Sequence, residues 1–474
     1  MAGQVSTAPR GALVQWSSLS FHWLRHRGAG LVVSLGAAMA AFALAGSLES
    51  AARTTLAIVI AAALLWITEA LPLHVTALAV LTAETVLLAL PGRPLAHLGP
   101  RAFVAAFVDP VLLLFLGGFA LEEALSQCSL DRRLVQAMLH RVPATAPGVL
   151  AGTIAVTGAL SMWMSNTATA ALMMAVMLPL VSRLDADDPF RRALLLAVPF
   201  AANIGGIGTP VGTPPNVIAL GALQRLGVTV SFARWMALGV PMATALSAVL
   251  WWVLLRCFPA KPTSLVHLRA AWASRPEPVT PQQRGVLAIA GLTAVGWLTA
   301  AWHGIPEWVV ALVPVIVLGG IGWLPSGAFR RMEWDVLVLM GGGLSLGFAL
   351  QASGLAGWAV GQPMGPWAAV GAAASVALML ATFISHTAAA ALLVPVVAGV
   401  GGPIAAQMAV AVALGVSGAM ALPVSTPPNA IAFGSGQLRV WDMVLIGLLI
   451  GVLMVALATL LVQVWIGVGP GAGG

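Results

Sequence analysis

The sequence Thr-Pro-Pro-Asn occurs twice, at residues 213–216 and 426–429, and each copy interrupts a long apolar stretch. Consecutive prolines remove two backbone donors, and their rings clash with the preceding turn, so they cannot lie inside a regular helix. The chain must therefore unwind at both places. We predict one discontinuous helix over 191–222 and another over 403–436.

The composition around these breaks indicates a protein embedded in a lipid bilayer. Of the 474 residues, 60% are hydrophobic and 8% are charged, whereas soluble domains carry about 25% charged residues. Apolar runs of roughly 20 residues, the length that spans a bilayer, recur from end to end. Irregular backbone at membrane depth is tolerated only where protein or water satisfies its polar groups, so we expect the breaks to line a functional site.

Two further apolar segments, 146–182 and 366–400, carry polar triplets near their middle. The triplets are Ser-Asn-Thr at 165–167 and Ser-His-Thr at 385–387. Each segment is too long for one span, and we interpret both as re-entrant hairpins whose tips are the triplets. The predicted fold is an all-α polytopic membrane protein with about eleven transmembrane helices and two re-entrant hairpins.

The hairpins and broken helices form an internal repeat. "SNTATAALMM" pairs with "SHTAAAALLV", and "TPPNVIALG" pairs with "TPPNAIAFG", in the same order in both halves. A looser pair, "LGGFALEEAL" (116–125) and "GGGLSLGFAL" (341–350), precedes them. We divide the chain into a cytoplasmic N-terminus with the first span (1–53), a first repeat (54–255), a cytoplasmic linker (256–284), a second repeat (285–467) and a tail (468–474).

The basic residues indicate how the chain crosses the membrane. If the N-terminus is cytoplasmic and the spans alternate, 17 of the 22 lysines and arginines fall on the cytoplasmic side, as the positive-inside rule expects. The hairpins then enter from opposite sides, so the repeats are inverted. This pattern explains the net charge of +7 without a nucleic-acid partner. We expect a multi-pass protein of the cell's inner (plasma) membrane.

Inverted repeats that each supply a hairpin and an interrupted helix are typical of secondary transporters, whose site lies near the bilayer midplane. Exposed helix N-termini carry a partial positive charge of about half a unit and favour anions. Freed carbonyl groups bind small cations. Because no Arg or Lys lies near the breaks, we predict an anion held by helix dipoles, hydroxyl groups and a coupled cation, Na⁺ or H⁺.

These motifs, together with "WITEALPLHVTAL" at 66–78, resemble the signature of the divalent anion/sodium symporters. The resemblance covers nearly the whole chain, from about residue 50 to residue 467. It implies a transporter of divalent organic anions, of the C4-dicarboxylate kind such as succinate or malate, that works by alternating access. It also implies a homodimer, and no cofactor beyond Na⁺ as the coupling ion.

The resemblance further implies which residues bind. Both halves would line the substrate, through Ser165, Asn166, Thr167, Thr213, Pro214, Ser385, His386, Thr387, Thr426 and Pro427. A first sodium site would use Ser161, Ser165, Asn166 and Gly212. A second would use Ser385, His386 and Ser425.

The second sodium site departs from the family pattern. His386 stands where the family usually has Asn, and Ala381 stands where it usually has a hydroxyl residue. Sodium, like other hard cations, prefers oxygen ligands. Our hypothesis is that the chain has one sodium site at most, and that His386 replaces the other as an imidazolium or a titrating proton carrier.

Other functions fit parts of the sequence. They are a sodium-independent dicarboxylate exchanger, a related ion/proton antiporter and, more distantly, an intramembrane serine hydrolase built on "GLSLG" (343–347) with His303 or His386 as its base. The Gly-x-Ser-x-Gly pattern is weak in a chain with 51 glycines, so we do not predict an enzyme. Acidic residues in or near the spans, such as Glu84, Glu122 and Asp335, are either helix-end anchors or proton relays.

Overall fold

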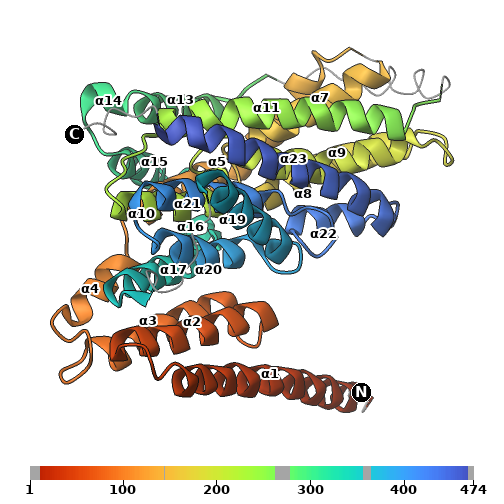
Figure 1. Cartoon of the computed structure of the whole chain (residues 1–474). Coiled ribbons are helices and arrows are strands. Elements are labelled where there is room, and N and C mark those ends of the chain that lie inside the picture. Colours follow the sequence, from red (N-terminus) through yellow and green to blue (C-terminus); the bar gives the residue numbers. More distant parts are fainter. Residues whose placement is uncertain (1–10, 144, 262–277, 356–364, 468–474) are drawn as a thin grey trace, which may run out of the picture.

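The computed structural model describes residues 11–143, 145–261, 278–355 and 365–467, and the regular secondary structure in these ranges is all helical. Within these described ranges, six segments are long and apolar enough to cross a bilayer. They are Arg27–Leu44 of α1 (Gly11–Leu44), α2 (Ser50–Thr68), α4 (Gly99–Phe107) with α5 (Val111–Gln127), α11 (Phe232–Cys257), α17 (Trp334–Ala352) and α23 (Val440–Gly467). The prediction of an all-α polytopic membrane protein is confirmed (Figure 1).

Several other apolar helices are shorter because the chain unwinds between them. The interrupted pairs are α9 (Phe190–Gly206) with α10 (Pro214–Arg225), and α21 (Gly402–Ser417) with α22 (Pro427–Phe433). In both pairs the second helix begins at the first proline of Thr-Pro-Pro-Asn. Proline is well suited to a first helical position, where its missing N–H would have no partner in any case.

Each polar triplet lies at a sharp turn between two helices. α7 (Ala146–Ser161) and α8 (Asn166–Val181) are joined through residues 162–165, and α19 (Pro366–Ala381) and α20 (His386–Ala398) are joined through residues 382–385. Both helices of the first pair pack on α9, and both helices of the second pair pack on α21. The two halves of the chain therefore repeat one arrangement.

Small residues allow these helices to approach closely. A Cβ atom on Gly205 of α9 would lie 2.3 Å from the carbonyl oxygen of Gly158 on α7. In the other half, a Cβ atom on Gly415 of α21 would lie 2.6 Å from the carbonyl oxygen of Ala374 on α19. Close backbone contact through small residues is the usual way in which membrane helices associate, and here it fixes each hairpin to its broken helix.

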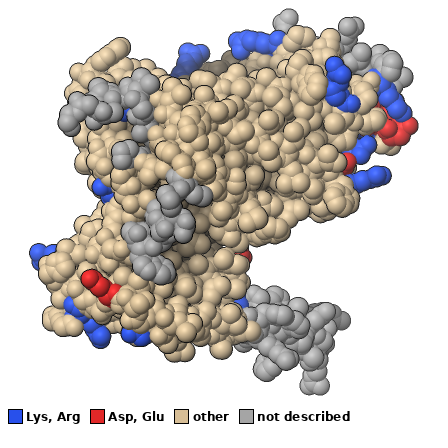
Figure 2. Space-filling view, in the orientation of Figure 1, with Lys and Arg blue, Asp and Glu red and all other residues tan. Residues whose placement is uncertain are grey.

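The remaining described helices complete the bundle. They are α3 (Leu73–Glu84), its π-helical continuation η1 (Thr85–Ala89), α6 (Leu130–Leu139), α13 (Pro281–Leu298), α14 (Ala300–His303), α15 (Glu307–Gly320) and α16 (Ser326–Arg331). α5 packs along α15, and α17 packs along both α3 and α20. In Figure 1, α1 to α4 form the lower part of the molecule, and Figure 2 shows the surface hollowed between that part and the rest.

Ion pairs bring several predicted cytoplasmic segments to one end of the bundle. Arg192 at the start of α9 contacts Asp442 at the start of α23, with 3.0 Å between nitrogen and oxygen. Lys261, which follows α11, pairs with Asp187 before α9. That this end faces the cytoplasm stays a prediction. Residues 1–10, residues 262–277 of the predicted linker and the predicted tail 468–474 lie outside the described residues.

Candidate functional site

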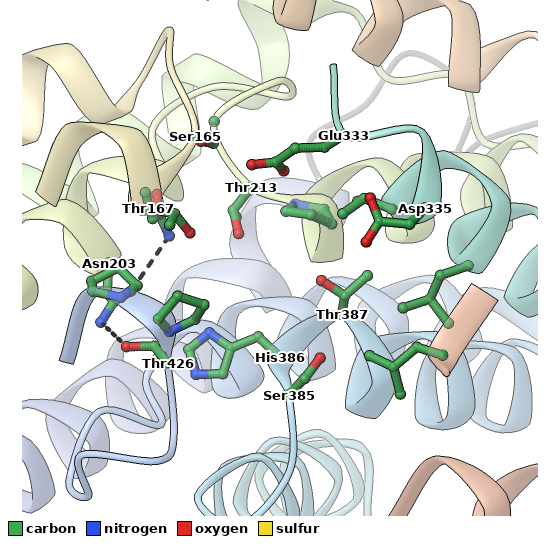
Figure 3. Close-up of a pocket in the computed structure, with 18 of the residues that line it drawn as sticks. Ser165, Thr167, Asn203, Thr213, Glu333, Asp335, Ser385, His386, Thr387 and Thr426 are labelled. Atoms are coloured by element: carbon green, nitrogen blue, oxygen red, sulfur yellow. Dashed lines mark hydrogen bonds between the residues drawn. The ribbon is translucent and has the colours of Figure 1, made fainter. Parts of the chain in front are cut away.

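The two polar triplets and the two Thr-Pro-Pro-Asn breaks surround one cavity of about 380 Å³. The ten residues that sequence reasoning assigned to the substrate all line it, and so does Gly212. Figure 3 shows hydroxyl groups and the His386 ring facing this space from both halves of the chain. Elements about 220 residues apart in sequence thus meet at one place, although their role in binding stays a prediction.

Four helices begin at the cavity wall. Asn166, His386, Pro214 and Pro427 are the first residues of α8, α20, α10 and α22, and all four line the cavity. The side chains of Ser165 and Ser385 cap α8 and α20 by accepting hydrogen bonds from the backbone N–H groups three residues later, at 3.3 and 3.2 Å. The partial positive charges of these N-termini favour an anion between them.

The asparagine of each Thr-Pro-Pro-Asn motif holds the unwound segment in place. The side-chain amide of Asn216 donates to the carbonyl oxygens of Gly206 and Thr209, at 3.0 and 2.8 Å. The amide of Asn429 donates to those of Met420 and Leu422, at 2.8 and 2.9 Å. Both asparagines are fully buried. Each amide therefore satisfies carbonyl groups that the helix break has left without partners.

Asn203 on α9, which sequence reasoning did not single out, connects the two halves. Its amide nitrogen donates to the hydroxyl oxygen of Thr426 at 3.3 Å, and its amide oxygen accepts from Asn166 at 3.4 Å (Figure 3). The residue is 1% exposed and lines the cavity. The available signal was a lone asparagine in a strongly apolar helix, since polar residues inside membrane helices are costly and usually functional.

Oxygen atoms converge at the predicted first sodium site. A Cβ atom on Gly212 would lie 2.4 Å from the carbonyl oxygen of Gly206 and 3.0 Å from that of Ser161. The hydroxyl group of Ser161 donates to the amide oxygen of Asn166 at 2.6 Å. Carbonyl, amide and hydroxyl oxygens of this kind fit a hard cation. The four residues predicted for this site, Ser165 included, thus lie side by side.

The predicted second site differs in chemistry. Nε2 of His386 lies 2.7 Å from the carbonyl oxygen of Ala419 in the second break. Because a carbonyl only accepts, this nitrogen carries the proton. The hydroxyl group of Ser425 donates to Thr382 and accepts from the N–H of Leu422. Buried Ala381 offers no side-chain oxygen, and the hairpin residue that contacts Ala419 in the break carries an imidazole.

Acidic side chains reach the site from α5 and α17. Glu333 and Asp335, at the start of α17, are the carboxylates among the described lining residues, and Arg and Lys do not occur in that set. Glu122 of α5 lies behind the first hairpin tip and accepts hydrogen bonds from Ser165. The sequence marked Glu122 and Asp335 as acids near spans but gave no reason to single out Glu333.

Ser345 of the "GLSLG" motif lies away from the cavity. It is fully buried and donates a hydrogen bond to Glu84. His303 lies in exposed α14, where Nε2 contacts the carbonyl oxygen of Gly296 at 2.9 Å. His386 is held by Ala419 instead. In the described part of the chain, the serine and the candidate bases proposed for a hydrolase therefore have other partners.

Comparison with known proteins finds similar chains among transporters. A family model described as "Citrate transporter" matches residues 63–415. An uncharacterized transporter from Haemophilus influenzae is 32% identical over 449 residues, which cover 88% of this chain and 93% of that protein. The sodium-dependent dicarboxylate transporter SdcS of Staphylococcus aureus (strain USA300) is 30% identical over 86% of this chain and 84% of its own length. SdcS of Staphylococcus saprophyticus is 29% identical over similar shares, 86% and 85%.

Proposed function

This chain belongs to the citrate transporter family, and we propose that it moves C4-dicarboxylates such as succinate or malate across the cell's inner membrane by secondary active transport. The observation that carries this proposal is the start of four helices at one cavity, α8, α10, α20 and α22. These N-termini come from opposite halves of the chain, so the two carboxylates of one small substrate can each meet a pair of them.

The coupling ion is Na⁺ in this proposal. Two carboxylates line the cavity, those of Glu333 and Asp335, and its described lining includes no lysine or arginine. Adding a dianion to a site that already carries negative charge is unfavourable in a medium of low dielectric constant. A cation bound among the oxygens near Gly212 offsets that repulsion, and the curated relatives named as sodium-dependent dicarboxylate transporters support this assignment.

We further propose that His386 takes the place of the second sodium ion. Its Nε2–H is fixed by Ala419, which leaves Nδ1 as the nitrogen that gains or loses a proton. A protonated ring would put a positive charge at the start of α20 beside the substrate. The transporter would then bind one sodium ion, and the protonated imidazole would supply the positive charge that a second sodium ion would otherwise bring.

Transport itself is proposed to occur by alternating access. The site-bearing hairpins and broken helices would move against a scaffold that includes the first span and the helices beside the linker. A homodimer is part of the proposal, as implied by the family resemblance. Figure 2 shows a hollow between α1–α4 and the rest of the molecule, and we propose it as the route by which the substrate reaches the site.

The test is uptake of labelled succinate into proteoliposomes under three conditions: an inward sodium gradient, no gradient, and internal unlabelled succinate without sodium. We expect uptake with the sodium gradient alone. Uptake that requires internal succinate and is the same with and without sodium would indicate a sodium-independent exchanger. Sodium or proton movement that needs no organic anion would indicate an antiporter. In the first condition, excess unlabelled citrate, sulfate or malate would be added in turn. The anions that inhibit the uptake of labelled succinate would define the substrate.

A further inference from the structure

The tip of the first hairpin is held by a carboxylate from another part of the bundle. Glu122 lies on α5, and Ser165 is the residue that caps α8. The backbone N–H of Ser165 donates to Oε2 of Glu122 at 2.7 Å, and its hydroxyl group donates to Oε1 at 2.9 Å. One carboxylate thus contacts two adjacent donors, the geometry with which such a tip would bind the carboxylate of a ligand.

These contacts leave Ser165 without a free hydrogen-bond donor. A backbone N–H and a serine hydroxyl each carry one proton, and Glu122 accepts both. The carboxylate of Glu333 also lies within hydrogen-bond reach of this hydroxyl group. The hydroxyl oxygen also accepts from the N–H of Ala168. In this conformation the oxygen atoms of Ser165 can still contact a cation. Ser165 cannot donate a hydrogen bond to an anion until its hydrogen bonds to Glu122 are broken.

Among the described residues, the second hairpin has no counterpart of this contact. The residue that matches Glu122 in the internal repeat is Gly347 on α17. A Cβ atom there would lie 3.2 Å from Cβ of Pro395 on α20, and one on Gly343 would lie 2.8 Å from Cα of Ala391. The second hairpin is therefore packed directly against α17 through glycine.

The matching helices of the first half, α5 and α8, differ from α17 and α20 in how they pack. Among the described helices, α17 and α20 form one of the most extensive packing contacts, whereas α5 and α8 do not form an extensive one. The first tip is thus connected to α5 by hydrogen bonds to a single side chain. Hydrogen bonds to one carboxylate can be exchanged for bonds to a ligand, while packed backbones cannot.

We propose that Glu122 is a latch that occupies the donors of the first hairpin tip in the empty transporter and must release Ser165 before a dicarboxylate is fully bound. This proposal rests on the proposed function, because in it Glu122 competes with a carboxylate group of the substrate for the hydrogen-bond donors of Ser165. Glu122 is a positioning residue: it acts through Ser165. Its carboxylate raises the substrate concentration needed for binding and keeps the unloaded tip in one conformation.

The test compares Glu122→Ala with Glu123→Ala. Glu123 is the next residue of α5, and its carboxylate contacts Arg331 and Gln127 instead of the hairpin. In purified protein, hydrogen–deuterium exchange of peptides spanning 162–169 should be at least about tenfold faster in Glu122→Ala, because the protecting acceptor is gone. Glu123→Ala should match the wild type. Equal exchange in the two variants would overturn the latch, whether or not the protein transports succinate.

Transport kinetics provide the second readout. Glu122→Ala should lower the KM for succinate at least roughly threefold, whereas loss of a merely structural contact would lower the maximal rate and leave KM unchanged or higher. An unchanged or raised KM overturns the proposal. If the wild type carries no dicarboxylate, the proposed function fails, and the exchange experiment still decides the latch. Should Glu122→Ala not fold, Glu122→Gln serves in both experiments, since its neutral amide keeps the size and loses the charge-assisted bond.

Discussion

The amide of Asn203, in the first half of the chain, donates to the hydroxyl oxygen of Thr426, in the second half, at 3.3 Å. The same side chain accepts from Asn166 in the first hairpin tip. One buried residue therefore connects a hairpin of one repeat with the helix break of the other. Both partners line the cavity, so Asn203 joins the two halves of the site directly.

Asn203→Ala should weaken substrate binding. The change removes three hydrogen bonds, those to Asn166, Thr426 and Asn429. Each is worth about 1 kcal/mol, and about 1.4 kcal/mol corresponds to tenfold in affinity. We expect the KM for succinate to rise at least roughly tenfold in proteoliposomes. Gln224→Ala, which removes an exposed amide at the end of α10, is the matched control. A KM equal to that of the control would mean that the hydrogen bonds of Asn203 do not position the site.

Gly212→Ala should damage sodium binding. Its new Cβ atom would lie 2.4 Å from the carbonyl oxygen of Gly206, so it displaces one of the oxygens proposed to hold Na⁺. The sodium concentration for half-maximal uptake should rise at least about tenfold, or uptake should be lost. Gly319→Ala, where a Cβ atom meets nothing within 4 Å, should behave as the wild type. An unchanged sodium dependence of Gly212→Ala would place the cation elsewhere.

His386→Asn combined with Ala381→Ser should create a second sodium site. The double change supplies an amide oxygen and a hydroxyl group in place of an imidazole and a methyl group. We expect the Hill coefficient for sodium to rise from about 1 toward 2 and the pH dependence of uptake to flatten. His386→Asn alone should already alter both profiles. If sodium and pH dependence are unchanged in both variants, His386 has no part in coupling.

Asn429→Ala should lower stability. It leaves the carbonyl oxygens of Met420 and Leu422 without their donor, at a cost of about 2–4 kcal/mol if no water replaces it. The thermal unfolding midpoint in detergent should fall by several degrees. Gln351→Ala, on α17 outside the cavity lining, should shift it much less. Equal midpoints for the two variants would contradict the role given to this asparagine.

The motifs predicted more of the site than of the contacts that hold it together. Proline pairs and polar triplets are local signals, because a regular helix cannot continue through two consecutive prolines. Together with the family resemblance that they carry, these motifs named ten of the residues that line the cavity. What Asn216 and Asn429 do was not predicted, since their partners are carbonyl groups of an unwound segment whose path depends on the whole fold.

Residues contributed by other helices were missed for the same reason. Asn203 and Glu333 were not singled out, and Glu122 was named only as an acid near a span. Nothing in the local sequence of these three residues indicates which face of the bundle they meet. Their contacts join residues 43 positions apart, for Glu122 and Ser165, or 223 apart, for Asn203 and Thr426. Helix packing alone decides such pairings.

The most direct test of the account is equilibrium binding of labelled succinate to the purified protein as sodium replaces choline at constant ionic strength. The central claim is that a cavity whose charged lining is acidic binds a dicarboxylate only together with Na⁺. We predict no measurable binding in choline and saturable binding that rises with sodium. Equal affinity for succinate in choline and in sodium would contradict the claim.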